Sequence, residues 1–212
     1  MTTPLGGEFP PAPDVPLRNP EWWYAQALSV TLGFEGGYEP PDPTDPGAKG
    51  GTNRGITQVT YDRWRRGQGL PTRDVRDLED SELQALYRDN YWTAGHGPDL
   101  VAHNAGHLAC CHFDGCVNHG DGESERLLQG VVHATVDGEI GPETLAAVDV
   151  AINAHGEAPV VYGYLLARRD LYRDILATHP DREKWRANWM RRLERLCVAH
   201  LGSDWLKPDD WT

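Results

Sequence analysis

Apolar residues recur at helical spacing along much of the chain, beginning with the stretch from Asn19 to Phe34. Asn19 can cap a helix there, and Pro20 suits the first helical position because its missing N–H would have no partner in any case. Gly36 and Gly37 favour the end of this helix, since glycine adopts positive φ without steric cost. We therefore predict a helix over 19–34, with an apolar stripe made by Trp23, Ala27, Val30, Leu32 and Phe34.

The same periodicity predicts two further helices in the middle of the chain. Thr57 can cap a helix that runs through Trp64, and Asp80 or Ser81 can open the next one. The apolar side chains expected to pack these helices are Val59, Tyr61, Trp64, Leu83, Leu86, Tyr87 and Tyr91. Residues 100–117 then read as one buried helix, because apolar and small residues dominate the whole stretch.

The last third of the chain is predicted to be helical throughout. Gly141 and Pro142 launch a helix, and two long helices follow over 159–178 and 181–201. Trp185 and Val198 belong to the apolar stripe of the last helix, and Trp205 looks like part of a chain end folded back on the body. The predicted fold class is therefore mainly α.

Residues 36–53 interrupt this helical pattern. They are dense in Gly, Pro, Asp and Thr, which favours turns, and we expect a small β-hairpin or irregular loop beside Glu35. At 212 residues the chain fits one domain or two packed lobes. We divide it into a flexible Pro/Gly-rich leader (1–18), a first folded region (19–117), a second helical region (118–201) and a tail (202–212).

Charge and hydropathy exclude several classes of function. The net charge of −12 and the isoelectric point near 5.1 argue against a nucleic-acid binder that works by phosphate neutralisation. No run of 18 apolar residues is present, so we expect no membrane insertion. The first 18 residues have neither a basic segment nor an apolar core, so we do not expect a secretory signal peptide.

The segment after the first helix holds a candidate catalytic carboxyl group. Glu35 is expected on the last turn, where apolar Phe34 and Tyr38 would desolvate it and retain its proton. A protonated Glu, an ionised Asp and a hydroxyl that holds water are the groups needed to break a glycosidic bond. Asp42, Asp45 and Thr52 lie in the following polar loop. The competing interpretation is a solvated glutamate at a helix cap.

Three motifs carry a resemblance to a known family. Glu-Gly-Gly-Tyr (35–38), Asp-Pro-Thr-Asp-Pro-Gly (42–47) and Gly-Thr-Asn-Arg-Gly-Ile-Thr (51–57) resemble the signature of the glycoside hydrolase family 108 lysozymes. The resemblance implies a lysozyme-like fold of two helical lobes bounding a cleft, and cleavage of the β-1,4 bond between N-acetylmuramic acid and N-acetylglucosamine in peptidoglycan. It implies Glu35 as the general acid, with Asp45 or Asp42 as the second carboxylate and Thr52 holding a water.

Further residues are candidates for substrate binding, and each has a structural alternative. Tyr91 and Trp92 can stack on a sugar face or belong to the core, and Asn118 can bind a sugar or end a helix. The block 113–120 around Asn118 also resembles the family. The candidate substrate-binding residues are Tyr38, Asp42, Asn53, Tyr91, Trp92 and Asn118.

A fourth motif marks the second region. Asp-Gly-Glu-Ile-Gly-Pro (137–142) resembles the start of the helical module labelled a peptidoglycan-binding domain in this family. The resemblance implies peptidoglycan glycan strands as the partner, and we expect a phage or prophage endolysin that works as a monomer. It would be made in the host cytoplasm and reach the wall through a holin or a secretion machine. The alternatives are a lytic transglycosylase, or a non-catalytic wall-binding or virion protein of the same fold.

Histidines and cysteines in residues 100–117 raise a metal hypothesis. His103 and His107 lie at i, i+4, as do His112 and Cys116, and either pair can offer two ligands on one helix face. Free cysteines are, however, commonly buried as apolar residues. We therefore predict no metal and no cofactor, and four reduced thiols, the fourth being Cys197.

The last two predicted helices carry nine of the twenty basic residues. Such a cluster can form a basic face toward an anionic wall, or solvated helix faces paired with neighbouring acids. The nine are Arg168, Arg169, Arg173, Arg182, Lys184, Arg186, Arg191, Arg192 and Arg195.

Overall fold

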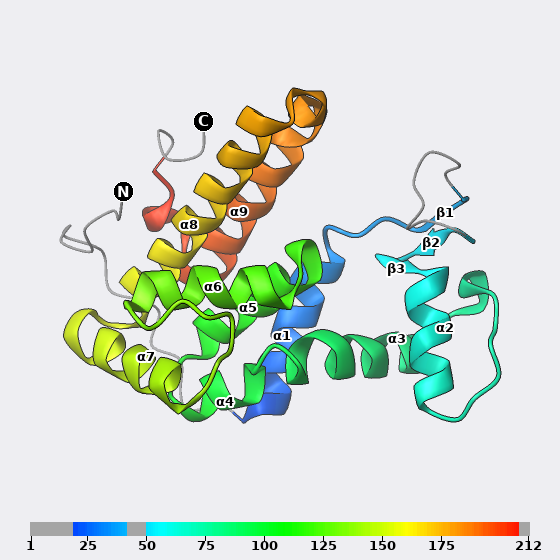
Figure 1. The fold of residues 1–212 in the computed structure, drawn as a ribbon, viewed down its shortest axis with the longest axis horizontal. Helices are drawn as coiled ribbons and strands as arrows, with labels where there is room; N and C mark the ends of the chain where they lie inside the picture. Colours follow the sequence, from blue (N-terminus) through cyan, green and yellow to red (C-terminus); the bar gives the residue numbers. More distant parts are fainter. Residues whose placement is uncertain (1–18, 42–49, 208–212) are drawn as a thin grey trace. The chain divides into compact units, whose positions relative to one another are not determined.

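The computed structural model describes residues 19–41 and 50–207. Helices dominate, and a three-stranded antiparallel sheet follows the first helix (Figure 1), so the prediction of a mainly α fold is confirmed. Within these two ranges, no helix combines the length and the apolar character needed to cross a membrane. The described chain forms two compact units, one made of residues 28–90 and the other of the residues before and after this range.

Helix α1 (Pro20–Leu32) begins as predicted, because the Asn19 side chain accepts a hydrogen bond of 2.9 Å from the N–H of Trp22. It ends two residues earlier than predicted. The N–H groups of Gly33, Phe34 and Glu35 each bond the carbonyl three residues back, which tightens the chain into turns. Glu35 therefore lies just beyond the helix.

The unit of residues 28–90 is built on the small sheet. Strands β1 (Tyr38–Glu39), β2 (Thr52–Asn53) and β3 (Ile56–Thr57) lie in that order, with Thr52 paired to both Glu39 and Thr57. Helix α2 (Gln58–Gly67) follows directly, and Thr57 caps it as predicted by accepting a hydrogen bond from the N–H of Thr60. The short helix η2 (Val75–Asp77) and helix α3 (Asp80–Tyr87) complete the unit.

The other unit is organised around helix α5 (Gly106–His119), which is buried from Gly106 to Cys116. Its neighbours are α4 (Gly97–Ala102), α6 (Asp121–Val132), α8 (Glu157–Thr178) and α9 (Arg186–Leu201). Helix α7 (Pro142–His155) starts at Pro142 as predicted and packs against α6 and α8. In Figure 1, α8 and α9 run side by side and are joined by η4 (Pro180–Trp185).

The prediction of one helix over residues 100–117 is wrong. Helix α4 stops at Ala102, and Asn104 takes a left-handed backbone with φ of 57° before α5 begins. A side chain on Gly106 would lie 2.1 Å from the Trp23 ring, so the start of α5 packs directly on that indole. The chain changes direction between α4 and α5, and the apolar pattern of the sequence did not predict this turn.

Some residues assigned to the core are at the surface. Trp185 is 46% exposed in η4 rather than in α9, and Val59 and Val198 are also exposed. Arg186 is the first residue of α9, which therefore starts five residues later than predicted. Trp205, in η5 (Ser203–Trp205), is buried against Tyr162, with ring centres 5.6 Å apart, so the chain end folds back as expected.

Candidate active site at the β2–β3 turn

The turn between β2 and β3 consists of Arg54 and Gly55 alone. Both have positive φ, 49° and 78°, which is the geometry of a type I′ turn. Glycine adopts this conformation freely, whereas for arginine it costs about 1–2 kcal/mol. The turn must therefore be held by contacts that offset this cost.

Glu35 lies against this turn. A Cβ atom on Gly55 would lie 2.8 Å from Glu35 Oε2 and 2.6 Å from the hydroxyl oxygen of Tyr87. A side chain at position 55 is excluded for this reason as well as by its φ. The space that glycine leaves open is where the carboxyl group of Glu35 and the hydroxyl of Tyr87 approach the backbone. Sequence reasoning missed Tyr87 as a site residue, because its helical spacing marks it only as core.

The sheet positions the other candidates of this unit. Thr52 is half-buried in β2, and Tyr38, 41% exposed, lies opposite Asn53 in the β1–β2 pair. The Arg76 guanidinium lies over the Tyr38 ring at 5.8 Å. The Asn53 side chain donates a hydrogen bond of 2.9 Å to the Val75 carbonyl, so one of its amide protons stabilises the fold.

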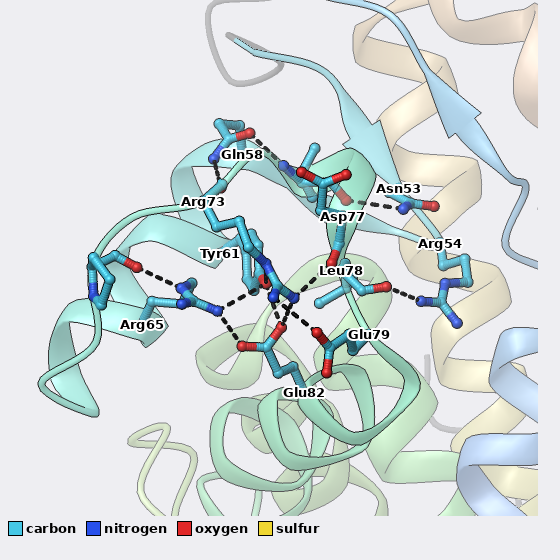
Figure 2. Close-up of polar contacts among 12 residues, drawn as sticks. Asn53, Arg54, Gln58, Tyr61, Arg65, Arg73, Asp77, Leu78, Glu79 and Glu82 are labelled. Carbon is cyan, nitrogen blue, oxygen red and sulfur yellow. Dashed lines mark hydrogen bonds and ion pairs between the residues drawn. The ribbon is translucent and has the colours of Figure 1, made fainter.

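Two side chains, one in the β2–β3 turn and one at the start of α2, bind the segment around η2 (Figure 2). The Gln58 amide accepts from the N–H of Val75 at 2.7 Å and donates to the Arg73 carbonyl at 2.8 Å. The Arg54 guanidinium donates to the Leu78 carbonyl at 2.7 Å. It also pairs with Asp80. The turn beside Glu35 is therefore anchored at several points to residues far along the chain.

A second cluster joins α2 to α3 around Glu82 (Figure 2). Its carboxylate pairs with Arg65 and Arg73 and accepts a hydrogen bond from the Tyr61 hydroxyl. Burial and the neighbouring Glu82 raise the pKa of Tyr61. Carboxylates and guanidinium groups removed from water must be paired in this way, because an isolated buried charge is costly.

Asp42 and Asp45, the two candidates for the second carboxylate, lie outside the described residues. The segment that contains them leaves β1 after Glu39 and enters β2 at Thr52. Because Glu39 pairs with Thr52, the two ends of the segment lie next to each other. The choice between the two aspartates stays a prediction.

The remaining candidates belong to the other unit. Trp92, in η3 (Arg88–Thr93), is 1% exposed and packs on Tyr24 and Phe113, with ring centres 5.7 Å and 6.0 Å away. Its structural surroundings are those of a core residue. Tyr91 beside it is half-buried.

Asn118 is half-buried near the end of α5. Its side-chain oxygen accepts a hydrogen bond of 2.6 Å from the Tyr172 hydroxyl. Gly120, with φ of 88°, ends the helix in its place. A sugar contact through the remaining amide protons of Asn118 stays a prediction.

The structure contradicts a basic face that includes all nine residues. Arg168 and Arg192 are buried, and both pair with Asp114, at 2.7 Å and 2.9 Å. Although burial alone would raise the pKa of Asp114, the two guanidinium groups hold it at about 2. Arg169 and Arg186 pair with the nearby acids Asp170 and Glu183. Charge counting could not distinguish these structural cations from solvated ones.

The histidines and cysteines of α5 lie in the core. All four cysteines are free and buried, and burial raises the pKa of Cys110, Cys111 and Cys116 well above the usual value. Residues 19–41 and 50–207 contain no group of three or more His, Cys, Asp or Glu side chains placed to hold a metal ion. His103 pairs instead with Asp149 at 2.8 Å.

The fold is mainly α, and the acidic side chain of Glu35 follows its first helix and lies against the β2–β3 turn. Residues 28–120 match the family described as glycosyl hydrolase 108, and residues 124–194 match a "Predicted Peptidoglycan domain". A comparison with curated proteins gives no match. The solved structure of SagA from Brucella abortus is similar, with a TM-score of 0.64 and 26% identity over 86% of this chain and 97% of that one.

The first folded region of the chain, residues 28–120, therefore matches glycoside hydrolase family 108, and a predicted peptidoglycan domain follows it over residues 124–194. The predicted lysozyme-like fold is confirmed by the same similarity to SagA. The protein is a glycoside hydrolase that acts on peptidoglycan, which is accordingly its partner.

Proposed function

We propose that the protein is an N-acetylmuramidase that cleaves the β-1,4 bond between N-acetylmuramic acid and N-acetylglucosamine, with Glu35 as general acid. The observation that carries this proposal is the position of Glu35. Its carboxyl group leaves the end of α1 and lies against the β2–β3 turn, within the region matched by the hydrolase family. Glu35 would protonate the leaving oxygen as positive charge develops on the sugar ring.

A second carboxylate and a hydroxyl complete the proposed mechanism. Asp45 or Asp42 would stabilise the oxocarbenium-like transition state or orient the attacking water, and Thr52 would hold that water. The β1–β2 pairing supports this assignment, because it places Thr52 at the end of the segment that carries both aspartates. Tyr38, in the paired strand, would contact the sugar through its exposed ring.

The replacement Glu35→Gln tests the proposal. The amide keeps the size of the side chain but has no proton to transfer, so we expect lytic activity on purified peptidoglycan to fall by about 10²–10⁴-fold. Helical circular dichroism should be unchanged. The matched control is Glu39→Gln, the same change in the exposed end of β1, which should leave activity within about twofold. Lysis that survives in Glu35→Gln and disappears in Glu39→Gln would move the acid to Glu39.

Product analysis separates hydrolysis from the two alternative activities. A muramidase releases reducing ends, whereas a lytic transglycosylase leaves 1,6-anhydro ends that mass spectrometry detects. A wall-binding protein without catalysis would release neither. We expect reducing ends from chloroform-treated Gram-negative cells and from isolated peptidoglycan.

We also propose a biological setting for this activity. We place the protein among phage or prophage endolysins, made in the host cytoplasm and released to the wall through a holin or a secretion machine. Lysis of the expressing cell only when a holin is co-expressed would support this route. We expect a monomer, which light scattering would distinguish from a dimer.

A further inference from the structure

Contacts hold both the backbone and the side chain of Arg54. Its carbonyl oxygen accepts a hydrogen bond of 2.9 Å from the Tyr87 hydroxyl, and its guanidinium group donates to the Leu78 carbonyl and pairs with Asp80. Figure 2 shows the guanidinium contact with Leu78, which lies just before α3. These contacts offset the cost of its left-handed backbone, φ 49°.

Tyr87 connects this turn to Glu35. It is the last residue of α3 and is 0% exposed. Its hydroxyl oxygen and Glu35 Oε2 lie within 2.6 Å and 2.8 Å of one point beside Gly55. The hydroxyl is therefore close both to the backbone of the turn and to the carboxyl group.

The direction of the hydroxyl proton determines what Tyr87 can offer to Glu35. A phenol has one proton to donate and two lone pairs to accept with. Because the Tyr87 hydroxyl donates its proton to the Arg54 carbonyl, its oxygen can act toward any other group only as an acceptor. An acceptor beside the carboxyl group of Glu35 can orient that group toward the leaving oxygen of the substrate.

We propose that Tyr87 and Arg54 are positioning residues for Glu35. Tyr87 fixes the β2–β3 turn through the Arg54 carbonyl and presents an acceptor to the carboxyl group of Glu35, and the Arg54 side chain anchors the same turn to α3. This inference rests on the proposed role of Glu35 as general acid.

The replacement Tyr87→Phe tests the first part by removing only the hydroxyl. We expect kcat on solubilised glycan strands to fall about tenfold or more, with KM within twofold.

Tyr61→Phe is the matched control. Tyr61 is also 0% exposed, lies in the same unit and also donates its hydroxyl proton, but to Glu82. It should lower the melting temperature while leaving kcat of the folded enzyme unchanged. If Tyr87→Phe and Tyr61→Phe change kcat alike, or if Tyr87→Phe keeps the wild-type kcat, the role of Tyr87 is overturned.

The replacement Arg54→Gly tests the second part. Glycine relieves the backbone strain at positive φ and so should preserve the turn, but it removes the anchor to Leu78 and Asp80. We expect kcat to fall several-fold with helical circular dichroism unchanged, and Arg54→Lys, which keeps one donor, to recover part of it. Full activity in Arg54→Gly would show that Arg54 only forms the turn.

The result for Glu35→Gln distinguishes failure of the proposed acid from failure of its positioning by Tyr87. Full activity in Glu35→Gln overturns both the proposed acid and its positioning by Tyr87. Loss of activity in Glu35→Gln together with wild-type behaviour of Tyr87→Phe overturns the positioning alone.

Discussion

At the scale of single residues, the site depends on the absence of a side chain at Gly55. Glycine there permits the positive φ of the β2–β3 turn and leaves room for Glu35 and Tyr87. The identity of this residue is thus set by two distant side chains as well as by its own backbone. The proposed second carboxylate, Asp45 or Asp42, belongs to the sequence between β1 and β2.

We predict that Asp45→Asn is more damaging than Asp42→Asn. Asp45 precedes Pro46-Gly47, a turn sequence that would aim its carboxylate, whereas Asp42 lies between two prolines and would shape the loop. Reducing-end release by the two variants, both with unchanged circular dichroism, checks this. Loss of turnover in Asp42→Asn and its retention in Asp45→Asn would shift the assignment by three residues.

At the scale of elements, helix α5 receives its N-terminal acceptor from another helix. Glu157, the first residue of α8, accepts a hydrogen bond of 3.0 Å from the N–H of Leu108. Burial raises the pKa of Glu157 to about 7, although backbone hydrogen bonds from Leu108 and His107 act in the opposite direction. Ionisation of this carboxyl group at neutral pH therefore costs folding free energy.

The replacement Glu157→Gln should raise stability at high pH. A carboxyl group whose folded pKa is raised from 4.5 to about 7 contributes stability at low pH, which is lost as the pH rises through that window. Glutamine keeps the acceptor and does not ionise, so we expect the variant to gain on the order of 3 kcal/mol relative to wild type between pH 5 and pH 8. Urea unfolding at both pH values measures the difference. An equal effect at pH 5 and pH 8 would contradict it.

At the scale of the whole molecule, buried polar groups join elements that are far apart in sequence. Asp114 of α5 binds Arg168 of α8 and Arg192 of α9, so one carboxylate links three helices. Two histidines of the same unit, His107 and His200, are buried, and burial lowers the pKa of His107 to about 4 and that of His200 to about 3. The thiols on α5 and α9 share this interior.

We predict that no metal contributes to stability. The four cysteines should resist thiol reagents in the native protein and all react after denaturation, because they are buried. EDTA should leave the melting temperature and the activity unchanged. A structural zinc would contribute about 10 kcal/mol or more, so stoichiometric zinc by elemental analysis, or a sharp fall in melting temperature with chelator, would contradict this prediction.

The sequence by itself determined the features that depend on neighbouring residues. Asn19 and Thr57 start their helices with side chains that reach only three residues ahead, and Pro142 starts α7 through its own restricted φ. The place of Glu35 near the end of the first helix and before two glycines was predicted in the same way. These signals are local, so they act before any tertiary contact forms.

Only the tertiary structure decided which residues meet across long separations. The break between α4 and α5 depends on close packing of Gly106 against Trp23, and the burial of Arg168 and Arg192 depends on Asp114. The contacts of Tyr87 with the β2–β3 turn join residues 33 positions apart. The apolar pattern of the sequence predicts that a residue such as Tyr87 is buried. The hydrogen-bond partner of its hydroxyl group is determined by how distant elements pack.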